Sequence, residues 1–242
     1  MAVVIPTYNQ FDYAKIAVDS LLANTANSLA VIVDDGSPLW NPAMWEKYPK
    51  HRLLLYRFEK NDKNLTRSWN KGIQLALTRN PKIIVAGNSD LKFPPNWIQG
   101  IEEALESAAG VVGPTTNAPG HRASQSIIKY YPGFKVSDSD VYISKVSSEL
   151  LRLQAGRTVS SPLNGFCIAA KATTWLKGSM GPGLFFNPKF KMTRNEDELM
   201  GRWKKLGITS AVACSSFVFH YRGVTRKPSG KGAGKGHLRI DS

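Results

Sequence analysis

Short apolar runs alternate with stretches of helical spacing along the first half of the chain. Five runs are typical of strands buried in a sheet: 2–5, 29–33, 53–58, 83–86 and 110–113. Three stretches carry apolar residues at helical spacing: 11–22, 67–78 and 97–108. This alternation predicts an α/β fold with a mostly parallel, doubly wound central sheet flanked by helices.

The second half has a less regular pattern. Residues 117–142 are rich in Pro, Gly, Ser and Tyr, which predicts a long loop or a lid. The elements expected beyond it are a helix at 144–155, a strand at 165–170, a helix at 196–206 and an apolar stretch at 208–219 that ends at His220. We find no linker between independent domains. A single domain over 1–223 is therefore expected, followed by a flexible Gly- and Lys-rich tail at 224–242.

Polar clusters follow the predicted strands where these end. They are Thr7-Tyr8-Asn9 after the first strand, Asp34-Asp35 after the second, and Asn88-Ser89-Asp90 after the fourth. Sheets of this class bind ligands at the carboxyl ends of their strands, so these clusters predict a binding site. Carboxylates such as Asp34 and Asp35 can accept hydrogen bonds from a base or from ribose hydroxyls. The alternative is an ordinary turn, because Asp and Gly are common turn residues.

Two further features suggest chemistry. Asp90 could bind Mg²⁺ or Mn²⁺, which take oxygen ligands, with His220 as a second ligand from far along the chain. The alternatives are a solvated turn and a packed histidine. Glu196 and Asp197 open a predicted helix, where acids interact favourably with the helix dipole. Their functional alternative is a general base that deprotonates an acceptor hydroxyl.

Charge and composition add information about partners. With 32 Lys and Arg against 18 Asp and Glu, the formal net charge is +14, which favours a polyanionic partner such as nucleic acid or an anionic membrane. Simple solubility is the alternative. Cys167 and Cys214 have no metal-ligand spacing and are expected to be reduced core residues. No signal peptide or membrane span is recognised, so we expect a cytoplasmic protein, either soluble or peripheral to the membrane.

In their order, these motifs resemble the family 2 glycosyltransferases. The resemblance rests on segments spread over about residues 2–223. In chain order they are 3–9 (VVIPTYN), 31–37 (VIVDDGS), 64–72 (NLTRSWNKG), 88–90 (NSD), 112–117 (VGPTTN), 164–167 (NGFC), 187–190 (NPKF), Glu196-Asp197 with Arg202, and 218–221 (VFHY). The resemblance implies a GT-A fold, with a nucleotide-binding half at about 1–115 and an acceptor or catalytic half at about 116–223.

Roles for individual residues follow from this resemblance alone. It implies a nucleotide-sugar site formed by Pro6, Thr7, Tyr8, Asn9, Asp34, Asp35, Arg67, Asn70, Asn88 and Ser89. Asp90, assisted by His220, would bind Mn²⁺ or Mg²⁺. Asp197 would be the catalytic base and Glu196 would position the acceptor or the donor sugar. The implied reaction is a metal-dependent transfer from a UDP-sugar, or a related nucleotide sugar, with inversion at the anomeric carbon.

Two positions depart from the family pattern. Asn88 stands where many members have Asp, which puts some metal or ribose contacts in doubt. Asn187 also stands where Asp is common. Neither change removes the proposed base or the principal metal carboxylate.

The acceptor stays open at this point. One hypothesis is a cell-envelope or lipid-linked glycan, with basic residues holding the enzyme on anionic lipid. A second is a hydroxylated base in DNA, as in phage-type DNA glycosylation, for which Lys227, Lys231 and Lys235 would contact phosphates. A third, of another class, is a catalytically inactive nucleotide- or nucleic-acid-binding module.

Overall fold

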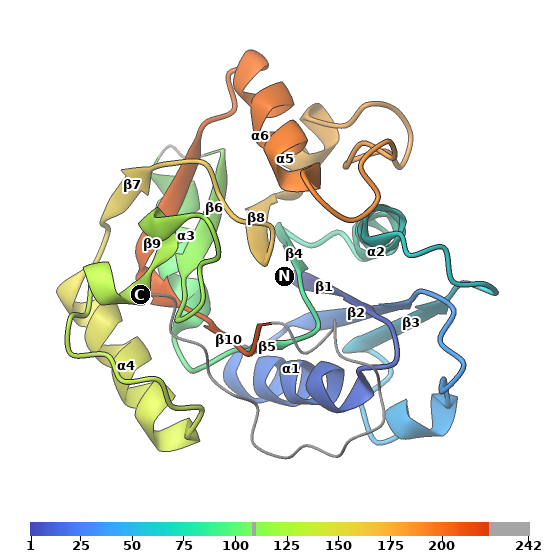
Figure 1. Ribbon diagram of the computed structural model, residues 1–242, viewed down its shortest axis with the longest axis horizontal. Coiled ribbons are helices and arrows are strands. Elements are labelled where there is room, and N and C mark those ends of the chain that lie inside the picture. Colours follow the sequence, from blue (N-terminus) through green and yellow to red (C-terminus); the bar gives the residue numbers. More distant parts are fainter. Residues whose placement is uncertain (108–109, 223–242) are drawn as a thin grey trace.

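The computed structural model describes residues 1–107 and 110–222, which form a central eight-stranded sheet and a separate two-stranded sheet (Figure 1). The order of the large sheet is β3-β2-β1-β4-β8-β6-β9-β7. Its strands are β1 (Ala2–Thr7), β2 (Leu29–Asp34), β3 (Leu53–Arg57), β4 (Ile83–Gly87), β6 (Val111–Thr115), β7 (Thr158–Ser160), β8 (Cys167–Lys171) and β9 (Ser210–Phe217). The small sheet pairs β5 (Leu91–Lys92) with β10 (Phe219–His220).

Strand direction confirms the mostly parallel sheet. β3, β2, β1 and β4 are all parallel neighbours, and β6 is parallel to β9. β8 is antiparallel to both β4 and β6, and β7 is antiparallel to β9. Because β8 comes from the second half of the chain and lies between two strands of the first half, both halves build one sheet.

Helices cover both faces of this sheet. They are α1 (Phe11–Asn24), α2 (Leu65–Leu77), α3 (Trp97–Glu106), α4 (Asp140–Leu153), α5 (Ala172–Lys177) and α6 (Asn195–Lys205). Successive side chains of a strand point to opposite faces. Val3 and Ile5 therefore pack with α1 and α3, whereas Ala2 and Val4 pack with α2, α5 and α6. Burial on both faces explains why these strands are continuous apolar runs.

Several predicted boundaries need correction. The helix expected at 144–155 begins one turn earlier, at Asp140, and the apolar stretch 208–219 is divided into β9 and β10. The 117–142 segment contains two short 3₁₀ helices, Ala123–Gln125 and Ile127–Lys129. The short elements β5, β7 and α5 were not predicted, because two to six residues are too few to show a period. The predicted tail at 224–242 lies outside the described residues.

Two smaller expectations concern the cysteines and the membrane. Cys167 and Cys214 are both free and buried, as expected of core residues. Over the described ranges, no helix combines the length and the apolar character that crossing a membrane requires.

Helix α2 packs closely on β1 because it carries a glycine at the contact. A Cβ atom on Gly72 would lie 2.1 Å from Cγ1 of Val4 and 3.1 Å from Cγ2 of Val33. We therefore expect Gly72→Ala to lower the free energy of unfolding by about 1–3 kcal/mol, despite the better helix propensity of alanine. Urea unfolding measures this change.

Gly201 in α6 provides the matched control, because a Cβ atom there meets no atom within 4 Å. Gly201→Ala is expected to raise the free energy of unfolding by about 0.5–1 kcal/mol. Equal effects of the two substitutions would contradict the close packing of α2 on β1.

Candidate functional site

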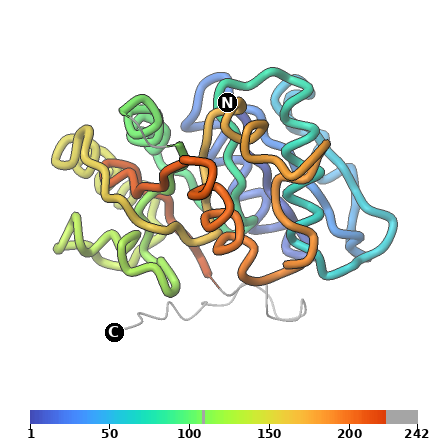
Figure 2. The backbone as a smooth tube through the Cα atoms, turned by 90° about the horizontal axis from the view of Figure 1, so that it is seen from above, coloured from blue at the N-terminus to red at the C-terminus, as the bar shows by residue number. Residues whose placement is uncertain are grey.

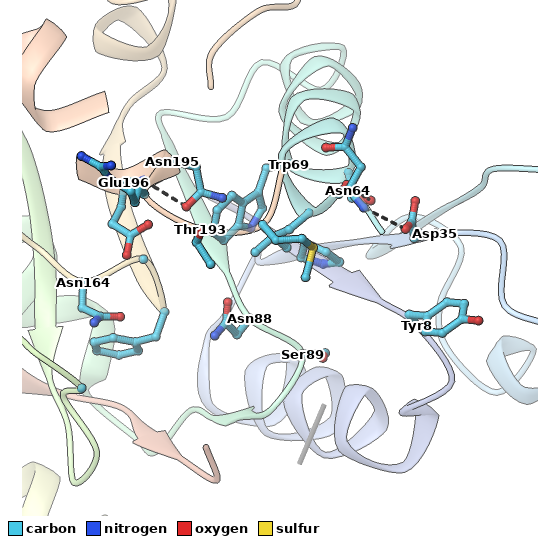
Figure 3. A pocket seen from close by; sticks show the side chains of 18 of the residues that line it. Tyr8, Asp35, Asn64, Trp69, Asn88, Ser89, Asn164, Thr193, Asn195 and Glu196 are labelled. Carbon is cyan, nitrogen blue, oxygen red and sulfur yellow. Dashed lines mark hydrogen bonds between the residues drawn. The ribbon is translucent and has the colours of Figure 1, made fainter. Parts of the chain in front are cut away.

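A cavity of about 820 Å³ lies where the parallel strands β1 and β4 end, bounded by the loop after β2 and by the start of α6 (Figure 3). The loop before α6, residues 187–194, borders the cavity and runs beside α2 (orange in Figures 1 and 2). We call this segment the strap. Thr66 fixes this strap: its N–H donates to Lys191 O at 3.1 Å and its hydroxyl donates to Phe190 O at 2.5 Å.

Nine of the fourteen residues predicted for the site line this cavity. They are Pro6, Thr7, Tyr8, Asp35, Asn88, Ser89, Glu196, Asp197 and His220. The other five, which are Asn9, Asp34, Arg67, Asn70 and Asp90, lie behind the lining and contact residues of the site or of its supporting loops.

Asp35 forms one end of the cavity together with Thr7 and Tyr8. Its Oδ1 pairs with Arg67, whose Nε donates at 2.7 Å, and its Oδ2 accepts from Asn61 Nδ2 at 2.8 Å. Arg67 also stacks its guanidinium 4.1 Å from the ring centre of Phe58. Arg67 therefore holds Asp35 in place instead of reaching into the cavity itself.

Asp34 points the other way and organises the turn after β2. Its side chain is fully buried, with Oδ2 accepting the N–H of Ser37 at 2.8 Å and Oδ1 accepting the Ser37 hydroxyl. Burial raises the pKa of Asp34, whereas the hydrogen bonds from Ser37 and the nearby charge of Arg57 act to lower it. Ser37 Oγ also accepts the N–H of Asn9, which has a left-handed backbone with φ 56°. The contacts of Asp34 and Asn9 with Ser37 fit the turn explanation, and Arg57 Nε lies 3.5 Å from Asp34 Oδ2.

Asn70 supports the loop that leads to the strap. Its Oδ1 accepts the N–H groups of Phe185 and Phe186 at 3.0 and 2.8 Å, and its Nδ2 donates to Phe186 O at 2.9 Å. These hydrogen bonds tie the side chain of Asn70 to backbone groups and keep it out of the cavity.

The middle of the cavity wall holds His220, with Asp90 directly behind it. The two-stranded sheet brings them together, because β10 is antiparallel to β5 and Tyr221 N donates to Asp90 O at 2.9 Å. His220 Nε2 lies 3.3 Å from Asp90 Oδ1, and Nδ1 lies 3.3 Å from Ala118 O. Since a carbonyl oxygen only accepts, Nδ1 carries a proton in this contact.

Asp90 Oδ1 is buried and accepts no hydrogen bond in the described part of the chain. His220 Nε2 lies 3.3 Å from this oxygen, but the contact does not have the geometry of a hydrogen bond. A buried carboxylate oxygen without a hydrogen bond is costly unless a proton or a cation compensates it. This orphaned oxygen, together with an imidazole nitrogen, fits a divalent metal ion such as Mn²⁺.

The first turn of α6 lies at the far end of the cavity and carries three acids, whose side chains make different contacts. Glu196 lies against Gly165, where a Cβ atom would meet Glu196 Cδ at 3.3 Å. Asp197 Oδ1 pairs with Arg122. Glu198 pairs with Arg202 on the next turn of the helix, at 2.9 Å. Only Glu196 and Asp197 of the three line the cavity.

Several lining residues were not predicted. They include Asn61, Lys63, Asn64, His121, Asn164, Met192, Arg194 and Arg222. The three cations among them, Lys63, Arg194 and Arg222, have left-handed backbones with φ of 46°, 61° and 41°. Such conformations are uncommon for residues other than Gly, Asn and Asp and depend on tertiary contacts, so no local sequence pattern marks these positions.

Comparison with known proteins gives both a family and a fold. The family model described as Glycosyl transferase family 2 matches residues 2–142, which is more than half of the chain. No match to a curated protein was found.

Three similar solved structures contain nucleotide or nucleotide-sugar ligands. S. aureus TarS 1–349 in complex with UDP-GlcNAc is 17% identical with a TM-score of 0.60, over 90% of this chain and 57% of that one. A Pyrobaculum calidifontis mannosyltransferase, PcManGT, in complex with GDP-Man and Mn²⁺ is 15% identical with a TM-score of 0.61, over 90% and 56%. GalNAc-T7 with UDP, GalNAc and Mn²⁺ is 12% identical with a TM-score of 0.62, over 90% and 42%. The chain therefore spans less than two thirds of each, and at these identities the likeness concerns the fold.

Proposed function

This chain belongs to glycosyl transferase family 2 and has the GT-A fold, and from this premise we propose that it transfers a sugar from a UDP-sugar, or a related nucleotide sugar, to an acceptor hydroxyl. The observation that carries the proposal is the cavity itself. One wall offers Asp35 to a nucleoside, the middle offers His220 with Asp90 behind it, and the far end offers the carboxylate of Asp197.

The donor half of the proposal rests on the end of the cavity near β1 and β2. Asp35 is held by Arg67 and Asn61, so it can accept hydrogen bonds from a base or a ribose without moving. Thr7 Oγ1 is buried without a hydrogen-bond partner in the described residues, which leaves it available to a ligand. Tyr8 is 42% exposed and offers an aromatic face beside these groups.

A metal ion is implied by this family, and the residues present fit one. No group of three or more His, Cys, Asp and Glu side chains suited to a metal occurs among residues 1–107 and 110–222, and the ligands we propose from this chain are Asp90 and His220. A site with few protein ligands is usual where substrate phosphates complete the coordination. When bound, the ion neutralises charge on the departing diphosphate.

Asp197 is the proposed general base. Its carboxylate takes the proton of the acceptor hydroxyl, and the oxygen forms a bond to the anomeric carbon from the side opposite the leaving group. The bond from the anomeric carbon to the diphosphate oxygen breaks, and its electron pair leaves with the nucleoside diphosphate. This single displacement inverts the anomeric configuration.

For the acceptor we propose a cell-envelope or lipid-linked glycan. The cations Lys63, Arg194 and Arg222 at the cavity are consistent with an acceptor or a surface that carries negative charge. The same cations would also suit DNA, so the two acceptors must be separated by experiment.

A donor and acceptor screen by UDP release, with Mn²⁺ present, tests this function. We expect release to be stimulated by a lipid-linked glycan in anionic vesicles and not by neutral vesicles without glycan. Stimulation by DNA with hydroxymethylated bases, together with binding that falls steeply with salt, would instead favour the DNA acceptor. Binding of UDP without turnover of any donor would show an inactive binding module.

A further inference from the structure

We propose that Arg122 is a positioning residue that holds the base Asp197 toward the cavity. This inference rests on the proposed function, because it assigns a partner to the proposed base. Arg122 Nη2 contacts Asp197 Oδ1 although the two residues are 75 positions apart in the sequence. The contact therefore joins the 117–142 segment to the first turn of α6.

The loop that carries Arg122 is anchored on both sides. Arg122 N donates to Pro119 O at 3.3 Å, and Arg122 O accepts the N–H of Gln125 at 2.9 Å. Gln125 is fully buried: its Nε2 donates to Pro114 O at 3.0 Å and its Oε1 accepts the N–H of Asn164 at 2.6 Å. The backbone at Arg122 is thus tied, through Gln125, to the end of β6 and to the cavity loop at Asn164.

The ion pair is specific for Asp197. Glu198 is already paired within α6, with Arg202, and Glu196 lies against Gly165. Arg122 reaches this helix turn from another segment of the chain. A carboxylate in the first turn of a helix gains from the helix dipole wherever its side chain points, so the dipole alone does not direct Asp197 toward the cavity.

The geometry of the pair leaves part of the carboxylate available. Arg122 Nη2 contacts one oxygen of Asp197, Oδ1, instead of making the two-point contact that arginine often makes with carboxylates. Arg122 Nε is buried and has no hydrogen-bond partner in the described ranges. Since Oδ1 is held by the guanidinium, Oδ2 is the oxygen free to accept a proton. Fixing a reacting group in this way favours the productive geometry.

A double-mutant cycle on the enzyme with Mn²⁺, and with the donor that turns over in the screen, tests this role. We expect Arg122→Met to lower kcat on the order of 10–100-fold while the Kd for UDP changes by less than about twofold. Arg122→Lys should restore part of the rate. In the Asp197→Asn background, Arg122→Met should change the residual rate by less than about twofold, because nothing remains to be positioned.

Other outcomes separate this inference from the proposed function. If Asp197→Asn loses activity but Arg122→Met keeps the wild-type kcat, or if the two losses multiply, the positioning role is wrong and the base assignment stands. If Asp197→Asn keeps the wild-type kcat, the base assignment is wrong and this inference is wrong with it. Arg79→Met, at an exposed turn after α2, is the matched control and should leave both kcat and Kd unchanged.

Discussion

Asp197→Asn is expected to lower kcat on the order of 10²–10⁴-fold, the range usual for loss of a general base. The substitution keeps the shape of the side chain, and the amide oxygen can still accept from Arg122, so the cavity should be preserved. The amide cannot take up the acceptor proton. Steady-state UDP release measures kcat, and calorimetric titration with UDP should give a Kd close to that of the wild type, because the nucleoside end of the cavity is untouched.

The control for this result must also test the helix-dipole explanation. Asp140 is suited to it, because it lies in the first turn of α4 and pairs with Lys92 at 2.9 Å, much as Asp197 lies in the first turn of α6 and pairs with Arg122. Asp140→Asn also removes an ion pair from the first turn of a helix, and because Asp140 is mostly exposed, only a small effect on stability is expected. An equal loss of activity in both variants, or full activity in Asp197→Asn, would show that the proton is accepted elsewhere.

The cluster at the ends of β1, β2 and β4 could be predicted from sequence because its physical basis is local. A buried parallel strand needs apolar side chains on both faces, so its end is marked where polar residues begin. The pattern cannot tell which of two adjacent acids faces a ligand. Asp34 and Asp35 are equivalent in sequence, yet Ser37 binds the first and Asn61 and Arg67 hold the second.

The parts of the site that could not be predicted from the sequence pattern depend on contacts between distant segments. The small sheet that joins Asp90 to His220 has two residues in each strand, which is too short for any periodicity. The residue pattern left His220 open between a second metal ligand and a packed histidine, and the family resemblance favoured the ligand. Arg122 had no such support, because its importance arises only when the loop at 117–126 folds against α6.

The second substitution for which we expect a large effect on activity is at Asp90. Asp90→Asn should lower Mn²⁺ affinity in the presence of UDP, and with it kcat, on the order of 100-fold or more, because it removes the proposed metal-binding charge. The free energy of unfolding should not fall, since the substitution replaces a buried carboxylate oxygen that accepts no hydrogen bond from the described residues. Titration with Mn²⁺ and urea unfolding measure the two quantities separately.

Asp34→Asn is the matched control, because Asp34 is also a buried carboxylate at a strand end. Its two oxygens accept from Ser37, so the amide would place one N–H group against a Ser37 donor. We expect a loss of about 1–3 kcal/mol in the free energy of unfolding and unchanged Mn²⁺ affinity. The opposite pattern, with stability lost at Asp90 and metal affinity lost at Asp34, would reverse the two assignments. The contrast follows from hydrogen bonding and position, because Ser37 donates to both oxygens of Asp34, which points away from the cavity, whereas Asp90 Oδ1 accepts no hydrogen bond from the described residues.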